Sequence, residues 1–524
     1  MREAKELKVR KTRTVEISSR WFRAASIGYL LLPVIIFLVT YLKPYIGIPA
    51  ALILLICFLA SLGTGPVARA HDRRFGKVEG SDKPGSLTLP LGFVIFLAVM
   101  AVILTITSGI GEFVYSTDDH SFRRAIFRDL INYKWPVVFD NSTQSNEIIA
   151  NYMGEGKVAF VYYFAYWMVP ALIGKLFGFA VGNIALVLWS ALGLFLILLG
   201  MNMFIGKKSL ATVFVFMFAS GLDAIPFMFH LYHGMPSWGW LEGWTHHLSY
   251  LSMATNLMNV YNQVIPCWLA AILLMTSGSN LMIGFIGALT FAYSPWVTIG
   301  ILPIAATRLF MKSSERKVKS ILGPLNVIPA VIMLIVFGSF YMAGSGEAMD
   351  RGFTWDFYGS IPRFAAAYIL LIIIEILPYL LLTRRSDLKS PLLITSVVTL
   401  LIIPFYMVSL NNDLCMRASM PALFVLTVYM AACLADVDYK KIRNGNVQPR
   451  HLGATIILVA MVYISAYYVY IGLAMTILGE FPEDEIGSLA DIKDDKYAVV
   501  VHDQFYSYDY ADTFFFEHLS RDGG

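Results

Sequence analysis

The sequence predicts an all-α polytopic membrane protein, and two observations support this prediction. Apolar residues make up 57% of the 524 residues and charged residues only 15%, whereas a soluble protein is about one quarter charged. The apolar residues also gather in runs of about 20, the length that crosses a bilayer as a helix. We therefore expect about 13 transmembrane helices, amphipathic helices on the outer face and a small soluble C-terminal segment.

Charge and cysteine placement exclude several classes of protein. The net charge of +4 is small, and the basic residues lie in short clusters between apolar runs, so we expect no nucleic-acid partner. Cys57, Cys267, Cys415 and Cys433 lie within or at the ends of apolar runs and have no CxxC spacing. They indicate small core residues instead of a disulfide framework or a zinc site.

The topology follows from placing the Lys and Arg clusters on the cytoplasmic side. The basic start of the chain is followed by an apolar run without a small-residue cleavage site, which predicts a cytoplasmic tail and a retained first span. Alternation then places the C-terminus on the outer face of an inner, cytoplasmic membrane. The spans are expected near 24–42, 47–64, 88–110, 181–204, 209–231, 257–276, 324–343, 364–383, 390–410, 417–436 and 453–477, with a Pro-broken pair at 280–294 and 297–310.

The apolar run 158–178 fits two topologies. If it crosses the membrane, Lys207 and Lys208 come to lie outside; if it is re-entrant or interfacial, they are cytoplasmic. Pro170, Lys175 and the Tyr- and Trp-rich composition suit an interfacial helix, so we adopt the second interpretation.

The chain then divides into five parts. These are a cytoplasmic basic tail (1–23), N-terminal transmembrane helices (24–110), a first large outer loop with surface or re-entrant helices (111–180), a transmembrane bundle (181–477) and an outer-face C-terminal segment (478–524). The last part contains one expected strand, 496–505, and an aromatic run, 512–519. It is short for a core of its own, so we expect it to dock on the outer loops.

The first outer loop concentrates groups that could do chemistry. Phe122, Ile126 and Leu130 fall near one helical face, which predicts an amphipathic helix on the membrane surface. A carboxylate beside this helix could accept a proton from a hydroxyl or bind a divalent cation, and an arginine could hold a phosphate. An interfacial helix with a capping Asp and solvated arginines fits the spacing equally well. The candidate residues are Asp118, Asp119, His120, Arg123, Arg124, Arg128 and Asp129.

The second outer loop mixes aromatic and hydrogen-bonding side chains. Such a mixture suits a sugar face, although an interfacial belt is the commoner interpretation of any single Trp. Metal binding by the two adjacent His would require a non-helical turn, because neighbours point apart on a helix. The residues are Trp238, Trp240, Glu242, Trp244, His246 and His247.

Polar residues also interrupt the spans near their outer ends. Asn256, Asn259, Asn262 and Gln263 recur at helical spacing just before Pro266. Four amides exceed what helix packing usually needs, so this pattern favours a polar cavity.

Two carboxylates fall inside apolar spans, where they are costly and are functional candidates by default. Asp223 lies near an outer end and could face the same cavity as the amides. Glu375 lies near the middle of its span, where a structural role as a protonated, hydrogen-bonded side chain fits at least as well as a functional role.

The short outer turn at 411–417 supplies Asp413 and Arg417. Arg417 opens an apolar span on the side where basic anchors are scarce, so it is a candidate for binding a lipid phosphate.

Several motifs together resemble the C-type glycosyltransferase (GT-C) superfamily, which includes protein O-mannosyltransferases and aminoarabinose transferases. They are the acidic pair in TDDH (117–120) with a helix after it, PALIGKLFG (170–178), and a span ending in the basic turn FIGKKSL (204–210). The resemblance covers most of the chain in layout and roughly 110–235 in sequence. Two spans precede the loop where the family commonly has one. VAFVYYF stands where the family has a His-Pro-Pro-Leu-like start.

The resemblance implies transfer of a sugar from a polyprenyl-phosphate donor to a glycan, lipid or protein acceptor on the outer face. Asp118 or Asp119 would be the catalytic base or would bind the acceptor. Arg417, helped by Arg123, Arg124 or Lys175, would hold the departing phosphate. No fixed cofactor is implied, and a divalent cation, Mg²⁺ or Mn²⁺, could be held by the two Asp.

Two alternatives stay open. A surface-polysaccharide polymerase would favour an Arg-bearing outer loop in the second half of the chain, for which 344–363 is a weak candidate. A lipid-linked sugar flippase or transporter would require charged pairs at mid-membrane, where the sequence offers Glu375 alone.

Overall fold

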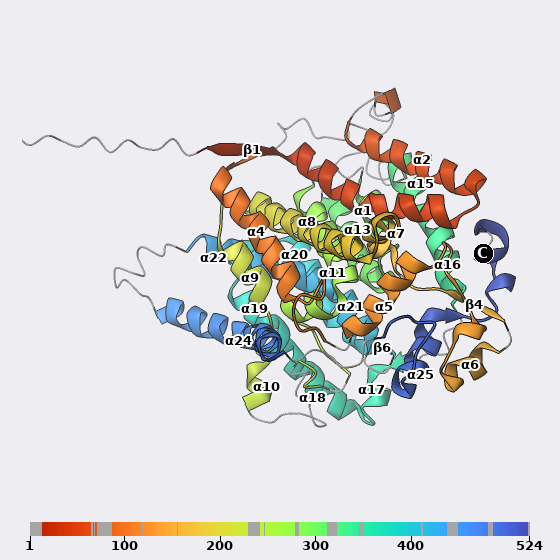
Figure 1. Ribbon diagram of the computed structural model, residues 1–524. Coiled ribbons are helices and arrows are strands. Elements are labelled where there is room, and N and C mark those ends of the chain that lie inside the picture. Colours follow the sequence, from red (N-terminus) through yellow and green to blue (C-terminus); the bar gives the residue numbers. More distant parts are fainter. Residues whose placement is uncertain are drawn as a thin grey trace, which may run out of the picture.

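The computed structural model is a helical bundle (Figure 1) in which 73% of the described residues are helical. It describes residues 13–63, 66–67, 69–70, 86–117, 119–154, 156–228, 242–245, 247–277, 282–311, 322–344, 351–409, 412–437, 449–479 and 486–521.

Seven helical stretches among the described residues are long and apolar enough to cross a membrane, or eight if one bent pair counts as a span. The prediction of a polytopic all-α membrane protein is therefore confirmed, whereas the number of about 13 spans is not. The stretches are α1 (Ser19–Tyr41), α2 (Pro44–Ser61), α8 (Phe179–Ile205), α11 (Met253–Thr276), α15 to α16 (Pro324–Met342), α18 to α19 (Ile361–Leu381), α21 to α22 (Asp413–Ala435), and the bent pair within α24 (Pro449–Leu478).

Several expected spans are shorter than a membrane crossing needs. The run 209–231 divides into α9 (Ala211–Phe218) and α10 (Ala224–Met228), because the chain turns away at Gly221 and packs on another span. The Pro-broken pair is present as α12 (Ile283–Thr290) and α13 (Pro295–Met311). The helices α4 (Leu91–Thr107) and α20 (Pro391–Ile402) are also short.

The ambiguous run 158–178 does not cross the bundle. Its helix α7 (Met168–Phe177) has 10 residues, which rise only about 15 Å, and it folds back on α8 where Gly174 meets Gly182. The amide of Asn183, at the start of α8, donates to the carbonyl of Gly111 just beyond α4 (2.8 Å). The ends of α4 and α7 and the start of α8 therefore lie together, as the interfacial interpretation predicts.

The packing of α1 on α8 fixes the two ends of the bundle. Phe22 in the first turn of α1 abuts Gly200 near the end of α8, and Tyr29 stacks on Trp189. The two helices are therefore antiparallel. We call the end that holds the start of α1 and residues 206–208 the basic end, and the end that holds residues 109–117 the loop end.

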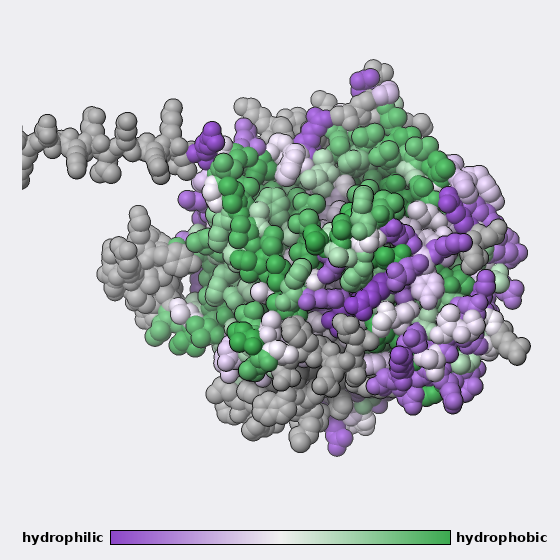
Figure 2. All heavy atoms as spheres, viewed as in Figure 1, coloured by the Kyte–Doolittle hydropathy of each residue, from purple (hydrophilic) through white to green (hydrophobic). Residues whose placement is uncertain are grey.

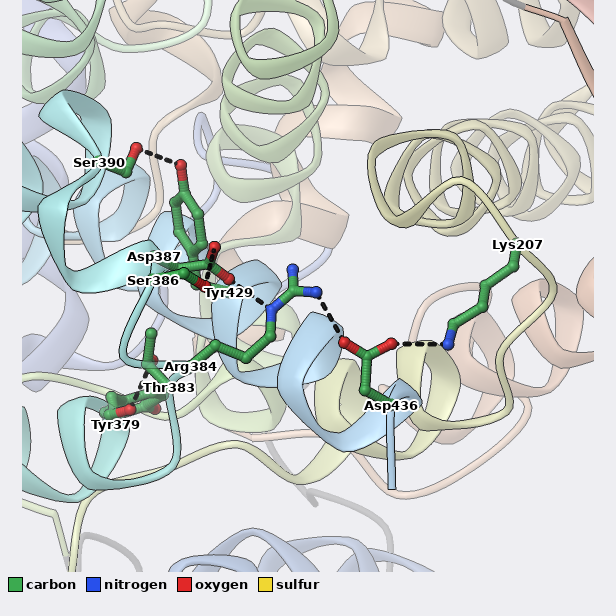
Figure 3. Close-up of polar contacts among 9 residues, drawn as sticks. All are labelled: Lys207, Tyr379, Thr383, Arg384, Ser386, Asp387, Ser390, Tyr429 and Asp436. Carbon is green, nitrogen blue, oxygen red and sulfur yellow. Dashed lines mark hydrogen bonds and ion pairs between the residues drawn. The ribbon is translucent and has the colours of Figure 1, made fainter. Parts of the chain in front are cut away.

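Ion pairs join three connections at the basic end. The carboxylate of Asp436 forms ion pairs with the side chains of Lys207 and Arg384, each with an N···O distance of 2.7 Å. Arg384 also forms an ion pair with Asp387 at 2.6 Å. Figure 3 shows Lys207 and Arg384 reaching Asp436 from different elements. The sequence-based topology places all of these residues on one side of the membrane, and the structure brings them together.

The C-terminal segment packs at the loop end. The backbone amide of Lys43, in the α1–α2 turn, donates to the carbonyl of Leu519 (2.8 Å). Strand β7 (Tyr506–Ser507) adds to β4 (Lys157–Phe160), which pairs with β3 (Val138–Asp140). The segment therefore docks on the first loop, as expected.

The prediction of a strand at 496–505 is wrong. These residues form α25 (Asp495–Phe505), which packs on α6 (Glu147–Met153). The apolar run Tyr-Ala-Val-Val-Val suggested a strand, but Ala498 and Val501 are buried three residues apart, which is helical spacing. The other strands form two small antiparallel pairs, β1 (Thr14–Ser18) with β2 (Ser86–Pro90) and β5 (Arg351–Phe353) with β6 (Tyr406–Val408).

The surface divides into an apolar and a polar region. Figure 2 shows hydrophobic residues over α2, α4 and α8, and hydrophilic residues gathered around α6 and α25 at the loop end. The exposed apolar side chains include Leu52, Ile56, Ile95 and Leu188. Such a continuous apolar surface is what a bilayer covers.

This arrangement predicts which positions share a side of the membrane. In intact cells, a membrane-impermeant maleimide is expected to label Ser142→Cys and Asp512→Cys, which are exposed at the loop end. It should label Lys208→Cys and Arg385→Cys, at the basic end, only after permeabilisation. The four native cysteines are buried or half-buried and serve as the background control. Labelling of both pairs in intact cells would contradict the topology.

Candidate functional site

The helix that follows the acidic pair is more deeply packed than a surface helix. α5 (Asp119–Asn132) buries Ile126 and Leu130 as expected, but it also buries Arg123 and Asp129. The C-terminal segment covers one side of it and α7 and α11 pack on the others. The expectation of a helix lying on the membrane surface is therefore wrong.

Asp129 joins α5 to the C-terminal segment. The hydroxyl of Ser488 and the backbone amide of Leu489 donate to its two carboxyl oxygens, at 2.6 and 2.9 Å. Burial raises the pKa of Asp129 to about 7, although both hydrogen bonds oppose this shift. Asp129 thus has a structural role.

This contact predicts a pH-dependent stability. Because the folded pKa lies above the ordinary value of 3.8, the stabilisation by Asp129 is complete below pH 4 and is lost as the pH rises through 7. The free energy of unfolding should fall by on the order of 2–4 kcal/mol as the pH rises across this range. Purified wild-type protein is expected to unfold at a lower temperature at pH 8 than at pH 5.5. Asp129→Asn should remove most of this difference, and an equal loss in both proteins would refute the assignment.

His120 and Thr117 attach the loop to an interruption in α11. The ring Nε2 of His120 contacts the carbonyl of Met258, and Thr117 donates to the Oδ1 of Asn259 at 2.9 Å. The next residue, Val260, has a non-helical backbone (φ −138°, ψ 41°). Burial, assisted by Arg123, lowers the pKa of His120 to about 3. His120 is therefore neutral near pH 7 and positions the loop.

Two predicted phosphate ligands are engaged elsewhere. Arg124 binds Ser116 at 3.1 Å and lies 4.0 Å from Glu112. Lys175 donates to the backbone carbonyls of Ile131 and Tyr133, where it caps the C-terminal end of α5. These cations hold the loop together, and their assignment to a phosphate is not supported by the geometry.

The remaining charged candidates converge. Arg123 pairs with Asp119 on α5 (3.4 Å), and Arg417 pairs with Asp413 on α21 (2.8 Å). Asp119 lies within electrostatic range of Arg417 and stabilises its positive charge. We call Asp119, Arg123, Tyr162, Tyr163, Asp413 and Arg417 the α5–α21 cluster.

The two tyrosines connect the halves of this cluster. Tyr162 lies within electrostatic range of both Arg123 and Arg417, and Tyr163 lies within range of Arg417. They belong to the segment between β4 and α7, which sequence reasoning treated only as interfacial. Their adjacent aromatic rings, 3.9 Å apart, carry no pattern that marks a site in the sequence.

The cluster contains both an exposed carboxylate and a buried donor without a partner. The side chain of Asp119 is 53% exposed, whereas that of Arg123 is 9% exposed. The Nε of Arg123 is buried and has no hydrogen-bond partner among the described residues. A buried donor without a partner is uncommon and costs about 1–3 kcal/mol. An anionic group with several oxygens could satisfy it. Asp118 lies outside the described residues.

A second polar cluster lies inside the bundle. The indole Nε1 of Trp244 donates to Asp223 (3.1 Å) and to Glu375 (3.2 Å), and the two carboxyl groups hydrogen-bond to each other. One proton must therefore lie between them. Gly221 permits the approach, because a Cβ there would lie 2.1 Å from the carboxyl of Glu375. Trp244 is thus a buried donor and not a member of an interfacial belt.

Glu242 lies two residues before Trp244 in the second outer loop, and its side chain is fully buried. The backbone amide of Ser252 donates to its Oε1 (3.1 Å), and its Oε2 has no partner among the described residues. Burial, with Asp223 nearby, raises the pKa of Glu242 to about 8. This residue is therefore mostly protonated near pH 7.

The amides of α11 do not form the continuous face that helical spacing predicts. Asn259 binds the loop, and the helix is interrupted at Val260, before Asn262 and Gln263. Asn256 donates to the carbonyl of Leu251 (2.8 Å). The amide nitrogen and oxygen of both Asn262 and Gln263 are buried without partners in the described part of the chain.

Of the two adjacent histidines of the second outer loop, the structure describes His247. The carbonyl of His247 accepts from Asn412 (2.8 Å), and its ring packs against Phe357 and Tyr358. His246 lies outside the described residues. No group of three or more His, Cys, Asp or Glu that could hold a metal ion is present among the residues described.

The sequence-based candidates therefore separate into three groups. Asp119 and Arg123 form one ion pair within electrostatic range of the pair Asp413 and Arg417, and Asp223 lies near Glu242 in a second cluster. Among the others that the structure describes, Asn262 and Gln263 have buried amide atoms without partners, and the rest contact the protein around them. Comparison with protein-family models, with curated proteins and with solved structures finds no match to this chain.

Proposed function

We propose that this protein is a membrane glycosyltransferase that moves a sugar from a polyprenyl-phosphate donor to a glycan, lipid or protein acceptor. The observation that supports this proposal is the meeting of Asp119 and Arg123 on α5 with Arg417 on α21. A carboxylate that solvent reaches beside two guanidinium groups suits deprotonation of a hydroxyl beside a phosphate.

The proposed reaction uses these groups as follows. The acceptor hydroxyl oxygen attacks the anomeric carbon of the donor sugar, and Asp119 accepts the hydroxyl proton. The bond between the anomeric carbon and the phosphate oxygen breaks, and its electron pair leaves with the phosphate. Arg123 and Arg417 hold the departing phosphate, which needs charge stabilisation more than protonation.

The proposal extends to location. The cytoplasmic membrane is the expected site, with the basic end in the cytoplasm and the loop end on the outer face. The acceptor hydroxyl would then approach from outside the cell. No resident cofactor is required by the reaction as written. A divalent cation at Asp118 and Asp119 stays a prediction, which EDTA treatment followed by Mg²⁺ or Mn²⁺ addition would test.

A transfer assay tests the proposed function. Purified protein in proteoliposomes is given polyprenyl-phosphate donors carrying radiolabelled sugars, together with an extract of cell-envelope glycans and lipids as acceptors. A labelled glycosidic product that depends on the protein supports the proposal. Labelled donor that crosses the bilayer without any new product would contradict it.

The second polar cluster favours one alternative. A flippase or transporter of lipid-linked sugars would use charged groups within the membrane, and the hydrogen-bonded pair Asp223 and Glu375 is such a group. The polymerase alternative receives less support, because Arg351 and Arg363, in its expected loop, are exposed and lie outside the α5–α21 cluster.

A further inference from the structure

The C-terminal segment reaches the α5–α21 cluster through one aromatic side chain. Phe505 is the last residue of α25 and is buried. Its ring packs edge-on against the ring of Tyr162, with 4.8 Å between the ring centroids and 69° between the planes. Tyr162 lies within electrostatic range of both Arg123 and Arg417. Phe505 therefore contacts a residue that is close to both arginines of the cluster.

The same ring also contacts α5. Its centroid lies 6.0 Å from that of Phe122, the residue before Arg123. Tyr497, in the first turn of α25, packs edge-on against Phe122 as well (5.2 Å, 89°). Asp129, which accepts hydrogen bonds from the C-terminal segment, lies seven residues after Phe122 and thus on the same face of α5. The segment therefore contacts this face at two points, about two helical turns apart.

Backbone hydrogen bonds hold Phe505 beside the linker 161–164, which joins β4 to the helical turns before α7. The amide of Val161 donates to the carbonyl of Phe505 (2.9 Å), and β7 continues this pairing along β4. The hydroxyl of Tyr506 donates to the carbonyl of Leu489 (2.5 Å), whose own amide binds Asp129. The ring of Phe505 is thus fixed both by the linker and by the rest of the C-terminal segment.

We propose that Phe505 is a positioning residue that holds α5 and the linker at the separation at which the cluster binds a phosphate. This inference rests on the proposed function. Arg123 and Arg417 belong to different elements, α5 and α21, so they can bind one phosphate together only while those elements keep a fixed separation. The Phe505 ring touches Phe122 on the α5 side and Tyr162 on the linker side, and a smaller side chain would let the two sides approach.

Phe505→Leu tests this role, because it removes the aromatic edge but keeps an apolar side chain. The matched control is Phe515→Leu, the same substitution at another buried residue of the C-terminal segment, whose ring packs on Phe340 of α16 (4.9 Å). Isothermal titration of purified protein with farnesyl phosphate measures binding. Phe505→Leu is expected to raise the Kd about tenfold, and Phe515→Leu should leave it unchanged. An unchanged Kd in Phe505→Leu, or an equal rise in both variants, would overturn the proposal.

A double-mutant cycle shows whether Phe505 acts through Tyr162. Tyr162→Leu removes the other side of the ring contact and should itself raise the Kd. Adding Phe505→Leu to Tyr162→Leu should raise the Kd little further, because the contact that Phe505 supports is already lost. If the two effects simply multiply, Phe505 does not act through Tyr162 and the proposal is overturned.

The transfer assay separates this inference from the proposed function. Weaker binding of farnesyl phosphate in Phe505→Leu, without sugar transfer by the wild type, would refute the proposed function and leave the positioning role standing. Sugar transfer by the wild type, with an unchanged Kd in Phe505→Leu, would overturn the positioning role alone. A wild-type protein that does not bind farnesyl phosphate would contradict both.

Discussion

Asp119→Asn is expected to lower sugar transfer by about 10²- to 10⁴-fold, the usual contribution of a general base. The amide keeps the shape of the side chain but cannot accept the acceptor's proton. The side chain is 53% exposed, so the substitution should change the unfolding temperature little. Initial rates in the proteoliposome assay measure the effect.

Two controls make the result interpretable. Asp512→Asn changes an exposed carboxylate of the C-terminal segment, away from the α5–α21 cluster, and should retain full activity. Asp118→Asn tests the neighbour in the acidic pair. Loss of transfer in Asp118→Asn but not in Asp119→Asn would identify Asp118 as the general base. Near-normal turnover by both of these variants would refute a catalytic role of the acidic pair.

Arg417→Gln is expected to lower kcat by about 10²- to 10³-fold, as the loss of one donor to a developing anion does. Arg417→Lys should recover part of this loss, because lysine keeps the charge but lacks the planar fork that binds a phosphate through two bonds. Asp413 keeps a hydrogen bond from Ser409 (2.8 Å), so its carboxylate does not lose every partner. Steady-state initial rates with saturating donor and acceptor give kcat.

The control for Arg417 lies at the opposite end of the bundle. Arg384 also pairs with carboxylates, Asp387 and Asp436 (Figure 3). Arg384→Gln removes two ion pairs, of 2.6 and 2.7 Å, that are about as short as the pair between Arg417 and Asp413 (2.8 Å), and it does not touch the α5–α21 cluster. It should leave kcat unchanged, and an equal loss of kcat in both variants would indicate a general structural effect.

Features set by local composition could be predicted from the sequence. The apolar runs identify α1, α2, α8 and α11 within a few residues. The basic turns correctly place 206–208 with 384–387, because Lys and Arg clusters follow a simple rule of membrane insertion. That rule also favoured an interfacial position for 158–178, a run in which the structure has the short helix α7, packed on α8.

Features that depend on tertiary packing could not be predicted from the sequence. Helical spacing assumed an unbroken α11, but His120 contacts a carbonyl just before the interruption at Val260. The burial of α5 depends on the C-terminal segment, whose contact at Asp129 spans about 360 residues of sequence. Long-range contacts of this kind leave no local pattern.

The second cluster illustrates the same limit. Asp223 and Glu375 each stood out as a carboxylate in an apolar run, yet nothing in the sequence pairs them. Their contact requires the chain to turn at Gly221 and a π-helical turn at Ile372–Ile376 in the facing span. Trp244, which donates to both carboxylates, looked like any tryptophan near a membrane surface.

The central claim is that the α5–α21 cluster binds the donor phosphate. An electron cryomicroscopy structure with a bound polyprenyl phosphate tests it most directly. We predict density for the phosphate within hydrogen-bond distance of the guanidinium groups of Arg123 and Arg417, with the carboxylate of Asp119 facing the position of the sugar. A phosphate bound at the basic end, beside Lys207 and Arg384, or against the exposed Arg351 would contradict this claim.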